Sequence, residues 1–236
     1  DGIVPRSLWT ASGGAGLLCP TVPEAYGGLG LDFRYNAVYD EEMAYAGLIL
    51  GRILQSDITC DYIVNYATEE QKQRILPKMI SGELVVGIAM TEPGAGSDLQ
   101  GVRTTARRDG DSYVINGSKT YISNGQTLDL VIVVTKTADA GAKGVSLVLV
   151  EADRPGFKRG RNLDKVGQHS SDTSELFFED VRVPAENVLG KEGAGFGYLM
   201  NQLAQERLSI AVTAQAGAQR AFDEAVKFTK DRRAFG

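Results

Sequence analysis

The sequence is poor in the residues that bind metals and form disulfides. Its 236 residues include one histidine and two cysteines. A site with several histidine ligands is therefore excluded, and a Ser-His-Asp triad could use only His169. Cys19 and Cys60 match no metal or redox spacing, so we expect two free thiols and no metal centre. His169 stands in a polar run and is expected in an exposed loop without a catalytic role.

Long hydrophobic runs and an excess of positive charge are also missing. No apolar run reaches the roughly 18 residues that a membrane span needs. The formal net charge of −5 argues against nucleic acid as the main partner, because phosphate binding requires a basic face. The hydrophobic fraction of 43% is ordinary for a soluble protein with a buried core.

The pattern along the chain predicts an α+β fold. Residues 1–84 are expected to form a helical domain, because 40–45 and 57–66 carry apolar residues at helical spacing. A capping box at 68–71 begins a further helix, which Gly82 ends.

Residues 85–190 predict a β-domain, an antiparallel barrel or sandwich. Short runs rich in Val, Ile, Leu and Tyr alternate with turn signals such as Asn116-Gly117. The last region, 191–236, predicts one long helix. Its apolar stripe consists of Leu199, Leu203, Ile210, Ala214, Ala218, Ala221, Ala225 and Phe228.

Two segments of the β-region could bind a ligand. At 90–98 (MTEPGAGSD) a strand runs into a loop whose glycines allow a ligand to approach the backbone closely. Leu99 replaces the third glycine of a dinucleotide fingerprint and no P-loop lysine follows, so a rigid turn is the alternative. The second segment, 119–125 (KTYISNG), is by its pattern alone more typical of an ordinary strand end.

Glu206 is the candidate base. It follows Leu203 by three residues and precedes Ile210 by four, which puts a carboxylate on the apolar face of its helix. Burial would raise the pKa of this carboxyl and make it a better base at neutral pH. Helical spacing alone favours the alternative, a glutamate at the edge of the stripe paired with an arginine.

Taken together, these segments resemble the acyl-CoA dehydrogenase family. The resemblance covers essentially the whole chain and is carried in order by CP at 19–20, EAYGGLG at 24–30, IAMTEPGAGS at 88–97, INGSKTYISNG at 115–125, FEDVRVPAENVL at 178–189 and DRRAFG at 231–236. It implies a helical domain, a β-domain and the first long helix of a four-helix bundle. The other three bundle helices, and a first N-terminal helix, are then expected outside this sequence.

The resemblance implies FAD as the cofactor. Thr91 would lie by the pyrimidine edge, Ser97 near the pyrophosphate, and Ser123 near flavin N5. Arg232 and Phe235 would contact the FAD of a neighbouring subunit. The cofactor-binding residues implied are Ile88, Ala89, Met90, Thr91, Glu92, Pro93, Gly94, Ala95, Gly96, Ser97, Tyr121, Ile122, Ser123, Arg232 and Phe235.

The activity implied is the oxidation of a fatty acyl-CoA to its trans-2-enoyl form, as in fatty-acid β-oxidation. Glu206 would abstract the α-proton while the β-hydride moves to flavin N5. The Glu206-Arg207 pair resembles the long-chain and isovaleryl types, whereas most relatives carry their base near the C-terminus. The substrate-binding residues implied are Ser97, Ala142, Lys143, Ala204, Gln205, Glu206 and Arg207. Ala204 departs from the Asp of many relatives, and Ala142 from the Ser of some.

The family also suggests partners and a location. We expect acyl-CoA as substrate, electron-transferring flavoprotein as electron acceptor, and a homodimer or homotetramer in the bacterial cytoplasm or the mitochondrial matrix. Two alternatives stay open: an acyl-CoA oxidase that uses oxygen, and a non-catalytic module that binds acyl-CoA or flavin. The second follows from the apolar helix face, which would lack partners in a chain that is by itself unstable and inactive.

Overall fold

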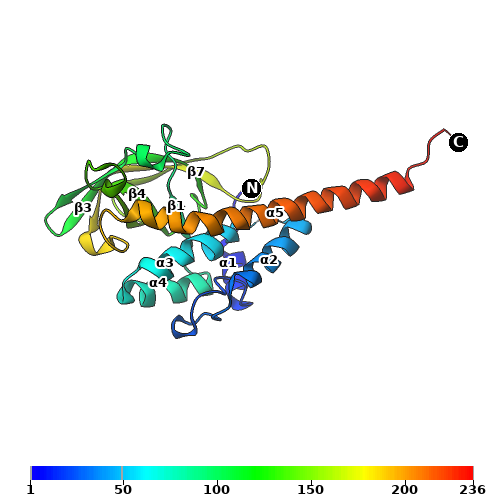
Figure 1. The fold of residues 1–236 in the computed structure, drawn as a ribbon, viewed down its shortest axis with the longest axis horizontal. Coiled ribbons are helices and arrows are strands. Elements are labelled where there is room, and N and C mark those ends of the chain that lie inside the picture. Colours follow the sequence, from blue (N-terminus) through cyan, green and yellow to red (C-terminus); the bar gives the residue numbers. More distant parts are fainter. Residues whose placement is uncertain (1, 49, 236) are drawn as a thin grey trace.

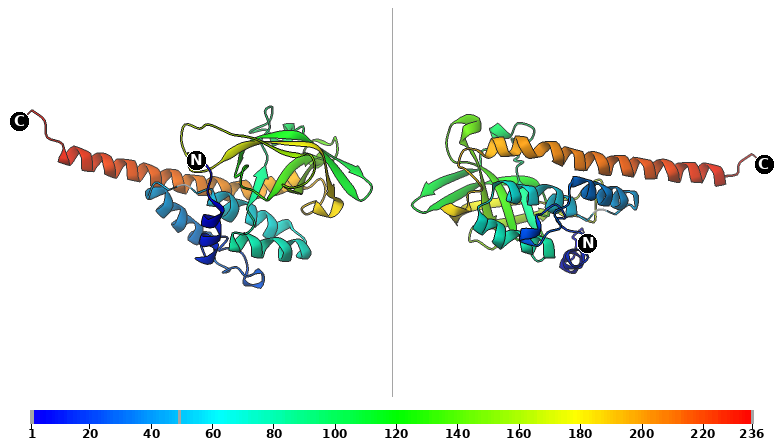
Figure 2. Two further views of the ribbon diagram at one scale, coloured as in Figure 1. Left: turned by 180° about the vertical axis from the view of Figure 1, so that it is seen from behind. Right: turned by 60° about the horizontal axis from the view of Figure 1, so that its bottom comes forward.

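A computed structural model describes residues 2–48 and 50–235. Helices form one layer, a sheet forms the other, and a long final helix runs alongside both (Figures 1 and 2). The first layer contains α1 (Arg6–Gly14), the 3₁₀ turn η1 (Glu24–Tyr26), α2 (Phe33–Tyr45), the π-helical turn η2 (Leu54–Thr59), α3 (Cys60–Tyr66) and α4 (Glu69–Ser81). One cluster of buried apolar side chains extends through both layers.

Helix α4 shows how local sequence fixes an element. The Thr68 side chain accepts a hydrogen bond from the Gln71 amide, and the Gln71 side chain accepts one from the Thr68 amide, which completes the expected capping box. Gly82 ends the helix with φ 76°, a left-handed conformation that favours glycine. The predicted helix over this segment is confirmed.

The π-helical turn η2 joins the two layers. Its Gln55 side chain donates to the carbonyls of Met79 (3.0 Å) and Leu84 (3.1 Å) and accepts from the amide of Val86 (2.9 Å). The helix predicted at 57–66 is present. Its first residues, however, belong to the wider π-helical turn η2, which the apolar spacing did not indicate.

Seven strands form one sheet in the described part of the chain. They are β1 (Val86–Ala89), β2 (Thr105–Asp109), β3 (Ser112–Ser123), β4 (Leu130–Lys136), β5 (Val145–Glu151), β6 (Phe157–Asn162) and β7 (Thr173–Pro184). The order is β1-β4-β2-β3-β7-β6, and β5 pairs with β4. The expected β-domain is present, but its sheet is mixed, because β1 runs parallel to β4 and the first residue of β2 also pairs in parallel with β4.

The turn expected at Asn116-Gly117 is wrong. Both residues lie inside β3, where the register with β7 shifts between Ile115 and Gly117. Gly117 has φ 151°, and a Cβ there would come within 2.4 Å of Thr104 Oγ1. The glycine therefore serves a bulge and a close approach of two strands rather than a hairpin. The hairpin turn between β2 and β3 lies at Gly110, where φ is 61°.

Strands β2 and β6 were not predicted, because their sequences are polar. Only Ala106 is buried in β2 (TARRD), and no residue of β6 (FKRGRN) is fully buried. Both strands are held by backbone pairing with β3 and β7 rather than by apolar alternation.

The long helix α5 (Gly195–Asp231) is confirmed, but its predicted apolar stripe is only partly right. Leu199 is buried and Leu203 is half-buried, whereas Ile210 and Phe228 are 59% and 62% exposed. The buried face beyond Leu203 instead carries Ser209 and Ala216. The C-terminal part of α5 extends past the other elements, and its apolar side chains Phe222 and Phe228 are 63% and 62% exposed (Figure 1). None of the helices in the described ranges has the length and apolar character needed to cross a membrane.

Candidate active site

The loop at 90–98 leaves β1 through a tight turn. The Glu92 amide donates to the Ala95 carbonyl (2.9 Å) and the Ala95 amide donates back to the Glu92 carbonyl (3.1 Å). Ala95 is buried beneath this turn, and Pro93, Gly94, Gly96 and Ser97 are exposed on its outer side. The turn therefore presents backbone and small side chains to the outside.

A buried ion pair supports the loop from below. Lys119 Nζ on β3 lies 2.8 Å from Glu92 Oε1 and donates to the Met90 carbonyl (3.1 Å). Glu92 also accepts from the amides of Arg103 (2.6 Å) and Thr104 (2.9 Å). Burial acts to raise the pKa of Glu92, but these hydrogen bonds outweigh it and leave the pKa below its usual value. Burial lowers the pKa of Lys119 to about 8, against the opposing effect of Glu92.

The end of β3 lies directly beside this loop. The Thr120 amide donates to the Thr91 carbonyl (2.9 Å). The next residue, Tyr121, has φ 58° at a second break in the pairing with β7, and its side chain is 69% exposed. Ile122 is buried and Ser123 is exposed. The structure thus unites the two segments that the sequence singled out, 90–98 and 119–125, in one surface.

This surface fits a large cofactor that lies against the backbone. A Cβ added to Gly94 or Gly96 would meet no atom within 4 Å, and neither glycine has a positive φ. Open space therefore lies directly over their peptide groups, where a ligand could approach. The Glu92 carboxylate is turned inward, and Ile88 and Ala89 are buried in β1, so these three could contribute only through the backbone.

Arg232 and Phe235 are not brought to this surface. Both are exposed beyond the end of α5, and Phe235 has φ 62°. They lie near the C-terminus, which projects away from the sheet (Figure 1). Gly236, the last residue of their motif, lies outside the described residues. His169 is exposed in a loop as expected, with Nε2 2.7 Å from the Lys165 carbonyl oxygen.

Glu206 is half-buried on α5. Its Oε1 accepts a hydrogen bond of 2.8 Å from the hydroxyl of Tyr62 on α3, a residue with no exposed surface. Burial raises the pKa of Glu206, while the Tyr62 hydrogen bond and the charge of Arg207 act in the opposite direction. The hydrogen-bond partner of the carboxylate is therefore Tyr62, and the Arg207 pairing that spacing alone favoured is not formed among the described ion pairs. Sequence reasoning missed Tyr62, since it reads as one more core residue of its helix.

The other candidate substrate residues are spread around the same part of α5. The Gln205 side-chain amide donates to the backbone carbonyl of Asp57 (3.0 Å) and to the Asp61 carboxylate, so it connects α5 to η2 and α3. Ala204 and Arg207 are exposed. Half-buried Ala142 and exposed Lys143 lie in the 3₁₀ turn η4 (Gly141–Gly144), which contacts α5.

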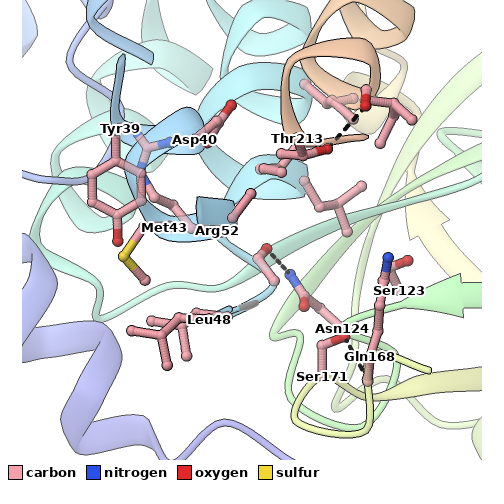
Figure 3. A pocket seen from close by; sticks show the side chains of 17 residues that line it. Tyr39, Asp40, Met43, Leu48, Arg52, Ser123, Asn124, Gln168, Ser171 and Thr213 are labelled. Atoms are coloured by element: carbon pink, nitrogen blue, oxygen red, sulfur yellow. Dashed lines mark hydrogen bonds and ion pairs between the residues drawn. The ribbon is translucent and has the colours of Figure 1, made fainter. Parts of the chain in front are cut away.

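A cavity of about 170 Å³ opens between α2, η2, α5 and the end of β3. Tyr39 and Met43 from α2 lie on one side, and Asn124 and Ser171 lie on the other (Figure 3). Its remaining lining residues are Asp40, Ala44, Leu48, Leu50, Gly51, Arg52, Ile53, Leu54, Ile58, Ser123, Gln168, Ile210 and Thr213. Of the sequence-predicted site residues, only Ser123 lines this cavity.

Glu206 does not line the cavity itself, but it is close in sequence to Ile210, which does. Ile210 follows Glu206 by four residues, so the two side chains lie on the same face of α5 one turn apart. Ile210 and Ser123 line the same cavity. Asn124 also lines the cavity, and its side-chain amide donates to the Gly51 carbonyl (3.2 Å).

A buried polar network forms the inner wall of this cavity. Arg52 donates to Asp40 and Asp57 (3.2 Å each) and to Asn36 Oδ1 (2.8 Å), and its guanidinium lies 4.0 Å from the centre of the Tyr39 ring. Burial raises the pKa of Asp40 to about 9, and the neighbouring Asp57 adds to this effect. The second oxygen of Asp57 accepts from Ser209 (3.1 Å), which connects the network to α5.

Models of known protein families match almost the whole chain in three parts. Residues 1–83 match the acyl-CoA dehydrogenase N-terminal domain, 87–181 the middle domain, and 193–236 the C-terminal domain. The domain boundaries predicted from the sequence lie at 84/85 and 190/191.

Individual relatives point the same way. The chain is 49% identical over its full length to the long-chain specific acyl-CoA dehydrogenase, mitochondrial, of Sus scrofa, and covers 56% of it. It is 41% identical to the isovaleryl-CoA dehydrogenase, mitochondrial, of Solanum tuberosum, with 98% of the chain and 57% of that protein covered. A crystal structure of an acyl-CoA dehydrogenase from Geobacillus kaustophilus superposes with a TM-score of 0.97 at 53% identity, over all of this chain and 63% of that one. The chain thus spans little more than half the length of the curated relatives it matches.

Proposed function

Since the chain belongs to the acyl-CoA dehydrogenase family, we propose that the protein it forms part of oxidises an acyl-CoA to the trans-2-enoyl-CoA. Glu206 is the base in this proposal. The observation that carries it is the half-buried carboxylate of Glu206, with its raised pKa, one helical turn from Ile210, which lines the cavity.

The reaction removes a proton from the α-carbon and a hydride from the β-carbon, and a C=C bond forms between them. Glu206 takes the proton at Oε2, because Oε1 is occupied by the Tyr62 hydroxyl. An α C–H is a weak acid, so the site must also stabilise enolate charge on the thioester oxygen as it develops. The raised pKa of Glu206 suits this role, since a stronger base transfers the proton at a smaller free-energy cost.

FAD is the cofactor in this proposal, and when bound it supplies the acceptor for the hydride. The exposed outer side of the 90–98 loop, together with Tyr121 and Ser123, is the surface proposed to hold it. The open space over Gly94 and Gly96 supports this assignment, as does the buried Glu92–Lys119 pair that fixes the loop from below. Arg232 and Phe235 are proposed to reach the FAD of a second subunit in a homo-oligomer.

The acyl group is proposed to enter the cavity beside Ile210. Leu48, Leu54 and Ile58 give this cavity an apolar lining suited to a hydrocarbon chain. Ala142 and Lys143 would contact the CoA portion, with the lysine available for a phosphate. Electron-transferring flavoprotein is the proposed acceptor of electrons from the reduced enzyme.

The test uses the full-length protein purified with its flavin. Palmitoyl-CoA or isovaleryl-CoA is added without oxygen to the wild type and to Glu206→Gln, and bleaching of the flavin absorbance is followed. We expect bleaching in the wild type and none in the variant. Retained bleaching in Glu206→Gln would move the base to another part of the protein, and a protein that binds no flavin would overturn the dehydrogenase assignment.

Further arms of the experiment separate the remaining alternatives. Reoxidation by air at a catalytic rate would indicate an oxidase, whereas reoxidation only by electron-transferring flavoprotein would support the dehydrogenase. The relative rates with the two acyl-CoA substrates report whether a long straight chain or a short branched one fits.

A further inference from the structure

The segment of α5 that carries Glu206 is fixed by polar contacts to η2 and α3 in addition to the apolar packing of Leu203. The Gln205 side-chain amide donates to the Asp57 backbone carbonyl and the Asp61 carboxylate. The Ser209 hydroxyl donates to the Asp57 carboxylate at Oδ2 (3.1 Å). Such directional contacts fix both the rotation and the height of a helix, which apolar packing constrains less strictly. Glu206 stands between these two anchors.

Tyr62 completes this arrangement at the carboxylate itself. It is fully buried, and its hydroxyl lies 2.8 Å from Glu206 Oε1. The centres of the Tyr62 and Tyr66 rings lie 6.2 Å apart, and the Tyr66 ring stacks on that of Tyr198 in α5 with 3.9 Å between centres. These three rings therefore connect α3 and α5. The Tyr62 hydroxyl is therefore held by packing and not by the carboxylate alone.

We propose that Tyr62 is the positioning residue of Glu206: its hydroxyl holds Oε1 and leaves Oε2 as the oxygen that receives the substrate proton. This inference rests on the proposed function, in which Glu206 is the base. Within the described residues, no other group hydrogen-bonds to this carboxylate, and Oε2 has no partner. The carboxylate therefore has one fixed oxygen and one free oxygen.

The same contact adjusts the basicity of Glu206. A donor that favours the carboxylate lowers its pKa, while burial raises it, so Tyr62 limits the upward shift. The groups that act on the carboxyl are Tyr62 from α3 and Arg207 from its own helix, and the acidic side chains of Asp57 and Asp61 are turned toward Gln205, Ser209 and Arg52. Without the hydroxyl, burial would raise the pKa of Glu206 further, and the carboxyl would hold its proton up to a higher pH.

The test compares Tyr62→Phe with Tyr66→Phe in full-length holoprotein. Both variants keep the ring and lose one hydroxyl from α3, but the Tyr66 hydroxyl accepts from Gln202 and does not contact Glu206. The carboxyl band of Glu206 is assigned by its disappearance in Glu206→Gln and titrated by infrared spectroscopy. Tyr62→Phe should raise the pKa of Glu206 by about one to two units, the amount expected for one hydrogen bond to a charged group. Tyr66→Phe should leave it unchanged.

Kinetics give a second readout. The limiting rate of flavin bleaching should fall about tenfold or more in Tyr62→Phe, with little change in the acyl-CoA concentration at half-maximal rate, because the position and protonation of the base change while the proposed substrate contacts remain. An unchanged Glu206 pKa in Tyr62→Phe, or an equal rise in Tyr66→Phe, would overturn the proposal. If Glu206→Gln itself still bleaches, the proposed base has failed, yet the titration still reports whether Tyr62 holds this carboxylate.

A wild-type measurement covers the case in which Tyr62→Phe does not fold. The ring carbon bonded to the Tyr62 hydroxyl is labelled with ¹³C and followed in a pH titration. Its chemical shift should change in one step at the pH where Glu206 is protonated. It should lose that step in Glu206→Gln. A Tyr62 signal that does not follow Glu206 in the wild type would contradict the contact on which the proposal stands.

Discussion

Replacing Lys119 by methionine should strongly destabilise the protein. The lysine side chain is fully buried under the 90–98 loop, and its ammonium pairs with Glu92 and donates to the Met90 carbonyl. Methionine fills a similar volume, so the main consequence is a buried Glu92 carboxylate without its counter-charge. Loss of one partner of a buried ion pair costs about 3–5 kcal/mol.

The structure indicates the lower end of this range. Glu92 keeps two backbone donors, the amides of Arg103 and Thr104, so the carboxylate is not left wholly unsatisfied. We therefore expect the free energy of unfolding to fall by about 3 kcal/mol in Lys119→Met. Loosening of the loop should also weaken flavin retention.

Urea unfolding of the full-length protein, followed by circular dichroism, measures the effect. Lys158→Met is the matched control, because the pair that Lys158 forms with Glu179 has 58% and 62% of its side chains exposed. Its loss should change the stability by less than about 1 kcal/mol. Equal stabilities of the two variants would refute the view that the buried pair supports the loop.

The pH dependence of stability gives an independent check. Burial lowers the pKa of Lys119 from 10.5 in an exposed lysine to about 8, so between these values the unfolded chain binds more protons than the folded one. The contribution of Lys119 to the free energy of unfolding should therefore rise with pH from about 8 to 10.5, and this rise should be missing in Lys119→Met. The pKa of Glu92 is lowered, so its contribution should be lost only in acid, as the pH falls below the usual carboxyl range.

Two glycine substitutions should affect different properties, one the stability of the fold and the other the binding of FAD. Gly117→Ala should destabilise the protein by at least about 2 kcal/mol in urea unfolding, because φ is 151° and the new Cβ would lie 2.4 Å from Thr104 Oγ1; an unchanged stability would contradict the close strand approach. Gly94→Ala should change the stability of the flavin-free protein by less than about 1 kcal/mol, because its Cβ would meet nothing within 4 Å. It should nevertheless weaken FAD binding, measured by flavin fluorescence, and an equal dissociation constant would remove Gly94 from the proposed cofactor surface.

Local signals predicted the elements that are specified locally. The capping box at Thr68 and Gln71 and the glycine at 82 both act within one helix, so the sequence is sufficient to place α4. The two candidate ligand segments were assigned through the family resemblance, because by its pattern alone KTYISNG is more typical of an ordinary strand end. The local pattern does not show that they lie side by side, since the Thr120–Thr91 hydrogen bond depends on the tertiary fold; only the resemblance, which assigned both to one FAD, implied it.

The sequence predictions were wrong where a residue distant in the sequence determines the local structure. Asn116-Gly117 has the composition of a turn, but the approach of Thr104 makes it a bulge inside β3. On α5, Gln205 and Ser209 face other helices because Asp57 and Asp61 offer polar partners there. An apolar stripe therefore predicted the wrong face beyond Leu203.

The cavity residues illustrate the same limit. Tyr39, Met43 and Leu48 look like ordinary core or surface positions of a helix and its end, and nothing in their spacing indicates that they border a cavity. Arg52 is charged and yet almost fully buried, which follows from its contacts with Asp40, Asp57 and Asn36. No local pattern predicts that combination.

The π-helical turn η2 sets the length of chain between two fixed points. Gln55 is bound to the first strand on one side, and Tyr62 meets Glu206 on the other. A π-turn contains one more residue than an α-helical turn. Removing one residue from 54–59 and rewinding the segment into an ordinary helix would leave the orientation of Tyr62 relative to Gln55 nearly unchanged, because the lost residue and the tighter turn offset each other. The segment therefore contains one residue more than an α-helix would need to join the sheet anchor at Gln55 to the Tyr62 contact with Glu206, and the wider turn accommodates that extra residue.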